Sequence, residues 1–528
     1  MDIRKIKLLL NTLKYLKPIQ VYYRFYYFFR NRIFSKEAKR KDIHEHNEIQ
    51  WKSNIVNSTS YKESSCSFHF LNIEHRFSNK IDWNYAGYGK LWTYNLNYFD
   101  FLHQEEMTKE MGLNLISDYL KNDSILIDGK EPYPISLRGI NWVKFLSEHK
   151  VKDHQIDEVL YNHYRTLLKN LEYHLLGNHL LENAFSLLFG AYYFQDETLY
   201  KTSKRLLVSE LNEQILEDGA HYELSPMYHQ ILFSRLLDCI QLIQLNTTWK
   251  NDELLSFLEK KATLMNSWLK NITYKNGDIP MVNDATYNIA PESSALFGYF
   301  EKLSILSKQI SLSESGYRKI VLDQYELFID VGNVGPLYQP GHAHSDTYNF
   351  ELIKKGKPVF VDRGISTYEK NAVRQVERST SSHNTVQIGS QEQTQVWGGF
   401  RVAERAEIVD LKEEKNVIKS GHDGYKKSGF MHQRVFHWEE NKIILEDKIS
   451  ASTNDTSRAF FHLHNSIEKP IIKRSKVLLN DRKISIEFEN CSNVEIGKYE
   501  LSKGFNKTES AYKIIVTFDQ NLVTTISI

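Results

Sequence analysis

Apolar positions follow two different periods in the two halves of the chain. From about residue 85 to 310 they recur every three or four residues, which predicts amphipathic helices. The clearest such segments are 156–176, 226–245 and 252–269. Short polar turns separate pairs of these segments, so we expect stacked helical hairpins in an all-α layer.

Beyond about residue 315 the segments become short, alternating or rich in β-branched residues, with Gly, Asn and Asp between them. Strand after strand without intervening helices predicts a β-sandwich. The expected strands are 325–331, 349–353, 358–362, 385–388, 434–438, 442–449, 483–488 and 511–518.

The length agrees with this division. A single core stops growing at about 250–300 residues, and the chain has 528. We expect an N-terminal helical and loop extension at 1–84, a helical catalytic domain at 85–315 and a β-sandwich domain at 316–528.

The first 34 residues predict a basic, aromatic, amphipathic helix with a break near Pro18. The segment is too charged to span a bilayer and lacks the apolar stretch and cleavage site of a signal peptide. Such a helix either packs on the body of the protein or makes a peripheral contact with a membrane surface. Without an export signal, cytoplasmic residence is the expectation.

The amino-acid composition limits which classes of partner can be expected. The net charge is +1, so no overall field attracts nucleic acid. The aromatic content suits either a large core or the stacking of sugar rings. Three cysteines without CxxC spacing argue against a disulfide framework or a thiolate zinc site. The sequence carries no signal for an oligomeric state.

The strongest chemical signal is the pair His342 and His344. On a strand, residues i and i+2 share a face, so both imidazoles could converge on one site. Asp362 and His383 follow at the edges of predicted strands. Two imidazoles and a carboxylate form a common zinc ligand set, although ordinary histidines in turns would give the same spacing.

Two further clusters lie in the helical half. Asn178, His179, Glu182 and Asn183 begin a predicted helix and are one turn apart. Before the helix at 226–245, Ser225 is a plausible N-cap and a proline follows it. That arrangement places Tyr222 or Tyr228 at a loop surface.

Aromatic and polar residues also alternate in segments 91–101 and 137–145. Stacking rings interleaved with amides and an arginine suit a sugar groove, whereas packing between helices explains the tryptophans equally well. The candidates for substrate binding here are Trp92, Asn95, Arg138 and Trp142.

The segments NHLLEN, DGAHYELSPMYH, GHAHSDTYNFEL, FVDRG and SSHNTV occur here in one order along most of the chain. In this set the sequence resembles the heparinase II/III-like polysaccharide lyases, a group that includes alginate lyases. The resemblance implies an N-terminal (α/α) toroid followed by a C-terminal antiparallel β-sandwich. It also implies cleavage of a 4-O-linked uronic acid in an anionic polysaccharide by β-elimination.

The resemblance assigns roles by position. Tyr228 is similar to the family's catalytic tyrosine, with Tyr222 as the fallback and Tyr368 as a candidate acid. His342 is similar to the active-site histidine, and either His179 or Asn183 to the group that neutralises the substrate carboxylate. The remaining residues so assigned are Asn178, Glu182 and Arg374 beside the substrate, and His344, Asp362 and His383 as ligands of a mainly structural Zn²⁺.

Two other functions stay open. A glycoside hydrolase on the same toroid would need two carboxylates facing one bond, and Glu182, Glu223 and Asp284 are the available acids. A non-catalytic polysaccharide-binding or assembly protein is the third hypothesis. Family lyases are commonly exported, so the missing export signal favours processing of a self-made or imported polymer.

Overall fold

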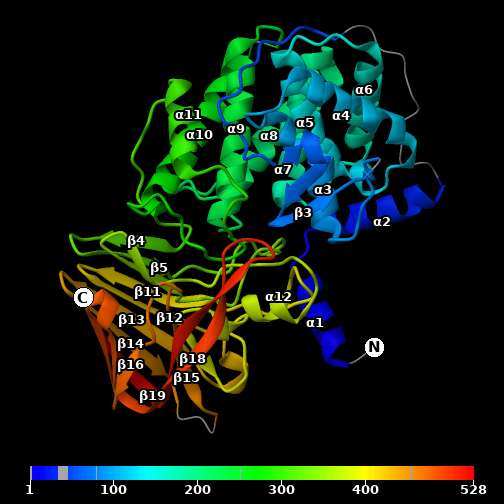
Figure 1. The fold of residues 1–528 in the computed structure, drawn as a ribbon. Helices are drawn as coiled ribbons and strands as arrows, with labels where there is room; N and C mark the ends of the chain where they lie inside the picture. Colours follow the sequence, from blue (N-terminus) through cyan, green and yellow to red (C-terminus); the bar gives the residue numbers. More distant parts are fainter. Residues whose placement is uncertain (1–2, 34–45, 79, 250, 452–454) are drawn as a thin grey trace.

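The computed structural model describes residues 3–33, 46–78, 80–249, 251–451 and 455–528. A helical body and a strand-rich body meet along a broad junction (Figure 1). This arrangement confirms the predicted toroid followed by a sandwich.

The helical body is built from hairpins in which sequence neighbours such as α7 and α8, or α9 and α10, pack together. A small antiparallel sheet of β1 (Tyr61–Lys62), β2 (Ser67–Phe70) and β3 (Ile73–Arg76) lies against it. The helices are α3 (Lys90–Tyr98), α4 (Lys109–Asn122), α5 (Pro132–Glu148), α6 (His154–Lys169), α7 (Gly177–Phe194), α8 (Glu197–Gln214), α9 (Pro226–Leu245), α10 (Asp252–Ile272) and α11 (Ser293–Lys302).

The strand-rich body begins with an antiparallel four-stranded sheet of β4 (Tyr317–Val321), β5 (Tyr325–Asp330), β6 (Phe350–Lys354) and β7 (Lys357–Phe360). Apolar residues of this sheet and of the larger sheet share one buried core, as in a sandwich. The larger sheet has the order β11 (Ile408–Glu414), β12 (Val417–His422), β13 (His432–Glu439), β14 (Lys442–Ile449), β19 (Thr508–Ser527), β18 (Ile484–Ser502), β17 (Lys476–Leu479) and β16 (Ile471–Lys473).

Shorter elements complete this body. Strand β15 (Ser457–His462) pairs with both β19 and β8 (Val386–Ile388). The hairpin of β9 (Val396–Trp397) and β10 (Arg401–Val402) and the short helix α12 (Ala372–Glu377) lie near the junction.

The chain begins with two separate helices, α1 (Ile3–Leu13) and α2 (Pro18–Ile33). The second starts at Pro18, as the sequence predicts, because proline is tolerated in a first helical turn but not in a helix interior. Among the described residues, none of the helices combines the length and the apolar character that crossing a bilayer requires.

Candidate active site

Loops and helix ends from both bodies meet at the junction. The segment 341–346, between β5 and β6, lies against the polar loop that ends at Asp284. Two hydrogen bonds join them: the Asp284 N–H donates to the His342 carbonyl (3.1 Å), and the His344 N–H donates to Asn283 Oδ1 (3.0 Å). His342 and His344 therefore lie in a loop between the predicted strands, so the rule that residues i and i+2 share a strand face does not apply to them.

Two tyrosines meet across the junction. Ser225 caps α9 by accepting from the Tyr228 N–H (3.3 Å), which fixes Tyr228 in the first turn. The Tyr228 hydroxyl lies 3.1 Å from that of Tyr368, and the Tyr228 ring lies 4.0 Å from that of His342, centre to centre. Burial raises the pKa of Tyr228 and of Tyr368, so both phenols are protonated at neutral pH.

Asp284 organises His342. Its carboxylate lies 2.8 Å from His342 Nδ1 and 2.9 Å from His344 Nε2, and Arg374 Nη2 donates to it (2.7 Å). Burial opposes ionisation, but Arg374 and the two histidines outweigh it and hold the pKa of Asp284 well below its usual range. A carboxylate at Nδ1 favours the tautomer that keeps the proton on Nδ1 and leaves His342 Nε2 unprotonated, 3.4 Å from Glu223 Oε2.

Asn178 faces that nitrogen from the first turn of α7. Its Nδ2 lies 3.3 Å from His342 Nε2 and donates to Glu223 Oε2 (2.9 Å). A Cβ added at Gly177 would lie 2.5 Å from Glu223 Oε1, so only glycine permits this close approach of α7 to Glu223. The sequence analysis placed Asn178 beside the substrate, and here it is the amide that contacts His342.

His179 and Asn183 both contact Glu172 but differ in exposure. The Asn183 side chain is fully buried and bonds Glu172 and Ser136. The His179 side chain is 30% exposed, with Nδ1 3.0 Å from Glu172 Oε1. Burial opposes its protonation, but Glu172 outweighs burial and raises the pKa of His179. Only His179 of this pair can present its ring to a ligand.

Several other predicted residues are structural. Arg374 is 1% exposed and is committed to Asp284, and Tyr222 is buried with its hydroxyl 3.1 Å from that of Tyr338. Glu182 is fully buried beside Arg235. These contacts leave no side chain of the three directed at a substrate.

The aromatic segments lie inside the helical body. Trp92 donates to the Ile73 carbonyl and Trp142 packs edge-on to Phe99, both at 0% exposure. Arg138 is equally buried and donates to the Asn97 carbonyl, while the half-buried Asn95 bonds the carbonyl of Leu91 within α3. These side chains make contacts within the helical body, so their predicted role in substrate binding receives no support from the structure.

A second group of polar residues lies behind His342. Ligand atoms of Asp346, Asp362 and His383 all lie within 4.8 Å of one another. His344 is next to them, with its ring centre 5.3 Å from that of His383. In the described part of the chain, buried His344 Nδ1, Asp346 Oδ2 and His383 Nε2 have no hydrogen-bond partner. Unpartnered nitrogen and oxygen atoms in such a group fit a divalent cation such as zinc.

His383 has a further feature of a metal ligand. Its Nδ1 lies 2.7 Å from Asp362 Oδ2, which leaves Nε2 as the free nitrogen. The sequence analysis missed Asp346, although it lies two residues after His344 in the same motif. Asp284, Glu223 and Asp346 are all buried carboxylates, and burying a charged group is unfavourable unless its partners compensate.

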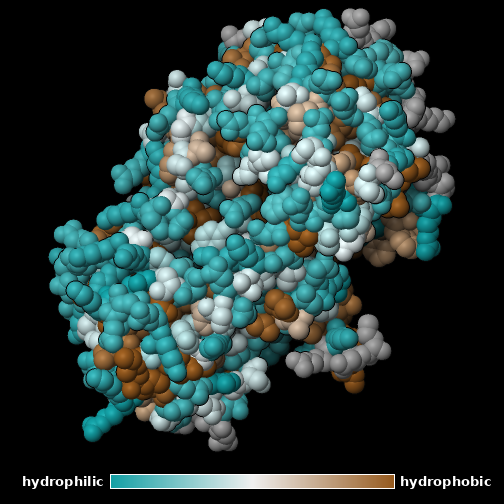
Figure 2. All heavy atoms as spheres, viewed as in Figure 1, coloured by the Kyte–Doolittle hydropathy of each residue, from teal (hydrophilic) through white to brown (hydrophobic). Residues whose placement is uncertain are grey.

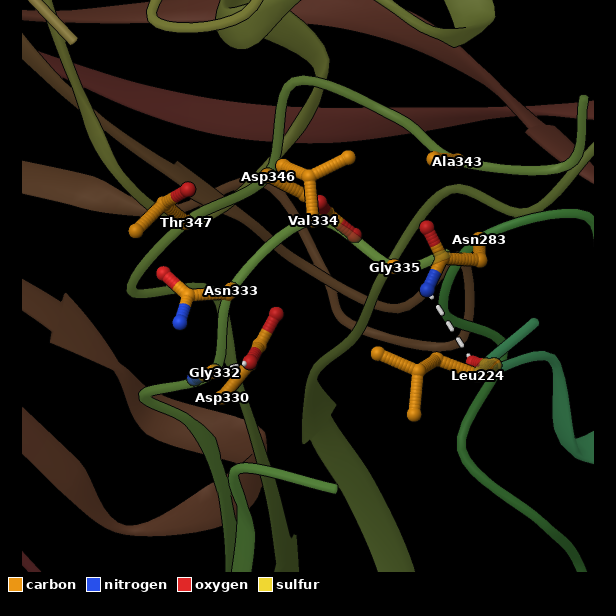
Figure 3. A pocket seen from close by; sticks show the side chains of 10 residues that line it. All are labelled: Leu224, Asn283, Asp330, Gly332, Asn333, Val334, Gly335, Ala343, Asp346 and Thr347. Carbon is orange, nitrogen blue, oxygen red and sulfur yellow. Dashed lines mark hydrogen bonds between the residues drawn. The ribbon is translucent and has the colours of Figure 1, made fainter. Parts of the chain in front are cut away.

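A small cavity adjoins this group (Figure 3). It lies under the loop that carries Ala343 and Asp346, and Asn283 spans its side by donating to the Leu224 carbonyl (3.0 Å). Its volume is about 10 Å³, enough for roughly one water. A sugar ring is too large for a cavity of this size. Phe400 and His179 are the partly exposed side chains near this site.

Comparisons with known proteins match both bodies. A family model described as heparinase II/III N-terminus matches residues 135–302, and one described as heparinase II/III-like, C-terminal, matches residues 305–528. A heparin-sulfate lyase of Bacteroides stercoris is 23% identical over 372 residues, which are 65% of this chain and 53% of that protein. The chain thus spans about half the length of this relative.

Solved structures with the same fold include a heparinase III, with a TM-score of 0.65 and 14% identity over 96% of this chain and 91% of the other. A heparan sulfate lyase from Pedobacter heparinus has a TM-score of 0.54 and 15% identity, covering 87% of this chain and 80% of the other. At these identities the likeness concerns the fold.

Proposed function

The chain belongs to the heparinase II/III-like family, and on that basis we propose that it is a polysaccharide lyase acting on a uronic-acid polymer by β-elimination. The observation that carries the proposal is the convergence of Tyr228, Tyr368, His342 and Asn178 at the junction of the two bodies. These side chains supply a proton acceptor, proton donors and an amide within one site.

The reaction sets the requirements. A base removes the C5 proton of the uronate, the C5–H electron pair forms the C4–C5 double bond, and the C4–O4 bond breaks. The leaving O4 takes a proton from an acid. Because the C5 proton is only weakly acidic, fixed donors must stabilise the charge that develops on the carboxylate.

We assign the base to His342 Nε2. Asp284 holds the opposite ring nitrogen at 2.8 Å, so it orients the ring and stabilises the imidazolium that forms. Asn178 Nδ2 lies beside the same nitrogen, where it can donate to the substrate carboxylate. Glu172 raises the pKa of His179, which favours the charged form of this imidazole at the exposed side.

We assign the acid to Tyr228, assisted by Tyr368. A tyrosine could act as the base only if nearby positive charge lowered its pKa from the usual value of about 10. Burial instead raises the pKa of Tyr228, which favours a neutral phenol that donates its proton to O4. The phenolate left behind is stabilised by the Tyr368 hydroxyl at 3.1 Å, and exchange with water restores both groups.

We further propose that His344, Asp346, Asp362 and His383 hold a Zn²⁺ ion. When bound, the ion would supply a positive charge that fixes the loop 341–346 and need not contact substrate. His344 links this group to the base, because its Nε2 shares Asp284 with His342.

The hydrolase alternative is less consistent with the geometry. Glu182 is enclosed beside Arg235, and Asp284 is occupied by Arg374 and two histidines. Neither carboxylate faces an open bond-cleavage position shared with Glu223.

The test is incubation of the purified, zinc-supplied protein with a panel of uronic-acid polymers, followed by ultraviolet absorbance of the unsaturated product. We expect turnover on at least one polymer and a loss of at least about 100-fold in Tyr228→Phe, the usual scale of general acid catalysis. Tyr512→Phe, on β19, is the matched control and should retain full activity.

Two results would count against the proposal. A folded protein that releases no unsaturated product from any uronate polymer contradicts the lyase assignment. New reducing ends without unsaturation would indicate hydrolysis instead.

A further inference from the structure

The first two helices carry positive charge only. Residues 3–33 contain eight Lys and Arg residues and no Asp or Glu. Both helices lie along one edge of the molecule, on the side of the N-terminus (Figure 1).

One face of α2 packs on the helical body. Gln20 donates to the Leu175 carbonyl (3.1 Å), and the Tyr23 ring stacks on Tyr173 with centres 4.6 Å apart. Tyr27 donates to the Leu171 carbonyl. Since these residues are three or four positions apart, they form a single docked stripe.

The opposite face of α2 is apolar and exposed. Phe25 is 62% exposed and Phe29 is 57% exposed, and Tyr22, Tyr26 and Phe28 lie on the same side. Apolar side chains are visible at the lower edge of the helical body, where α2 lies (Figure 2). These exposed aromatic rings form an apolar surface that no other part of the described structure covers.

Helix α1 repeats the arrangement on the sandwich. Asn11 donates to Glu404 Oε1 (2.9 Å), and Trp397 Nε1 donates to Thr12 Oγ1 (3.1 Å). Its exposed side carries an aliphatic stripe of Ile3, Ile6, Leu10 and Leu13.

Basic side chains border both apolar stripes. Lys5 and Lys7 are exposed on α1, and Lys14 is exposed just after its end. Lys7 and Lys14 lie close enough to Lys427 to repel it. Two acids interrupt the basic surface: Glu213 pairs with Lys17, and Glu404 pairs with Lys427. The remaining surface has an excess of positive charge around an apolar centre.

We propose that α1 and α2 dock the protein peripherally on an anionic phospholipid bilayer. Aliphatic and phenylalanine side chains on convex helices suit insertion between lipid acyl chains, and the bordering lysines suit anionic headgroups. A polysaccharide is a weaker match for Ile3, Leu10 and Leu13, because aliphatic side chains neither stack on sugar rings nor form hydrogen bonds.

Vesicle flotation of the full chain tests this proposal. We expect the protein to float with phosphatidylcholine vesicles that contain about 30 mol% phosphatidylglycerol and not to bind vesicles of pure phosphatidylcholine. Raising the salt concentration to about 0.5 M should release the bound protein. Phe25→Ser with Phe29→Ser should lower binding at least about tenfold, since it removes the largest inserted side chains. Lys5→Glu with Lys7→Glu should weaken binding mainly at low salt.

The matched control is the pair Ile127→Ser and Leu306→Ser, which changes two exposed aliphatic residues away from both helices. It should bind vesicles like the wild type, and thermal melting checks that all variants are folded. Failure of folded wild type to float with anionic vesicles would overturn the proposal, as would unchanged binding in the phenylalanine variant. Retention on an immobilised anionic polysaccharide through Phe25 and Phe29, without flotation, would also refute it.

Discussion

Replacing Glu182 by glutamine should stabilise the protein at neutral and alkaline pH. Glu182 is fully buried on α7, and within the described residues neither of its carboxylate oxygens has a hydrogen-bond partner. Burial raises the pKa of Glu182 from 4.5 to about 7, with Arg235 opposing the shift and Asp100 adding to it. Glutamine matches the shape of the protonated acid but cannot ionise.

The magnitude follows from the two pKa values. They differ by about 2.5 units, and at about 1.4 kcal/mol per unit the shift is worth about 3 kcal/mol. A carboxyl with a raised folded-state pKa binds more protons when folded. Its contribution is therefore fully present below pH 4.5 and is lost as the pH rises through about 7.

The assay is denaturant unfolding of wild type and Glu182→Gln at several values from about pH 4.5 to 8.5. Tryptophan fluorescence reports mainly the helical body, because six of the eight tryptophans precede residue 303. The two proteins should be equally stable at the acid end, and the variant should be about 3 kcal/mol more stable at the alkaline end. Glu253→Gln, whose carboxylate is exposed, should follow the wild type throughout. A stability difference between wild type and Glu182→Gln that does not change with pH would contradict this prediction.

Three further predictions concern other buried charges. Asp284→Asn should lower turnover at least about 100-fold in the product assay, because His342 loses the carboxylate that orients it. His383→Ala should abolish bound zinc in elemental analysis of the purified protein, whereas His342→Ala should retain the zinc and lose activity. Asp447→Asn should cost about 3–5 kcal/mol in denaturant unfolding, since it leaves the guanidinium of Arg434 buried without its partner. Burial opposes ionisation of Asp447, but Arg434 outweighs burial and lowers the pKa of Asp447 to about 2. The stabilisation by the Asp447–Arg434 pair is therefore present above the unfolded pKa of 3.8 and is lost as the pH falls towards 2.

Local signals in the sequence predicted many elements closely. Helix α9 has the bounds 226–245 because Ser225 and Pro226 mark its start, and β14 has the bounds 442–449. Helix α6 ends at Lys169 instead of continuing to residue 176, although Leu167 and Leu171 are buried at helical spacing. A tight turn that buries its leucines gives the same apolar pattern as a helix, so spacing alone cannot separate them.

The site was harder to predict because its contacts are long-range. Tyr228 and Tyr368 are 140 positions apart, and Asp284 and His342 are 58 apart. The sequence motifs identified which segments contain site residues, but they did not show which side chains of those segments contact each other. Asn178 and Asn183 are both asparagines on α7, and only tertiary packing directs the first to His342 and the second to Glu172.

The first two helices connect the two bodies across the junction. Helix α2 packs on residues 169–175 of the helical body, and α1 packs on the β9–β10 hairpin. The same hairpin reaches the proposed active site: the Gly399 carbonyl accepts from Arg374, which donates to Asp284. One run of contacts therefore leads from α1 through this hairpin and Arg374 to Asp284. Any coupling between attachment at the N-terminal helices and substrate binding would be reciprocal, so each event would alter the affinity of the other by the same factor.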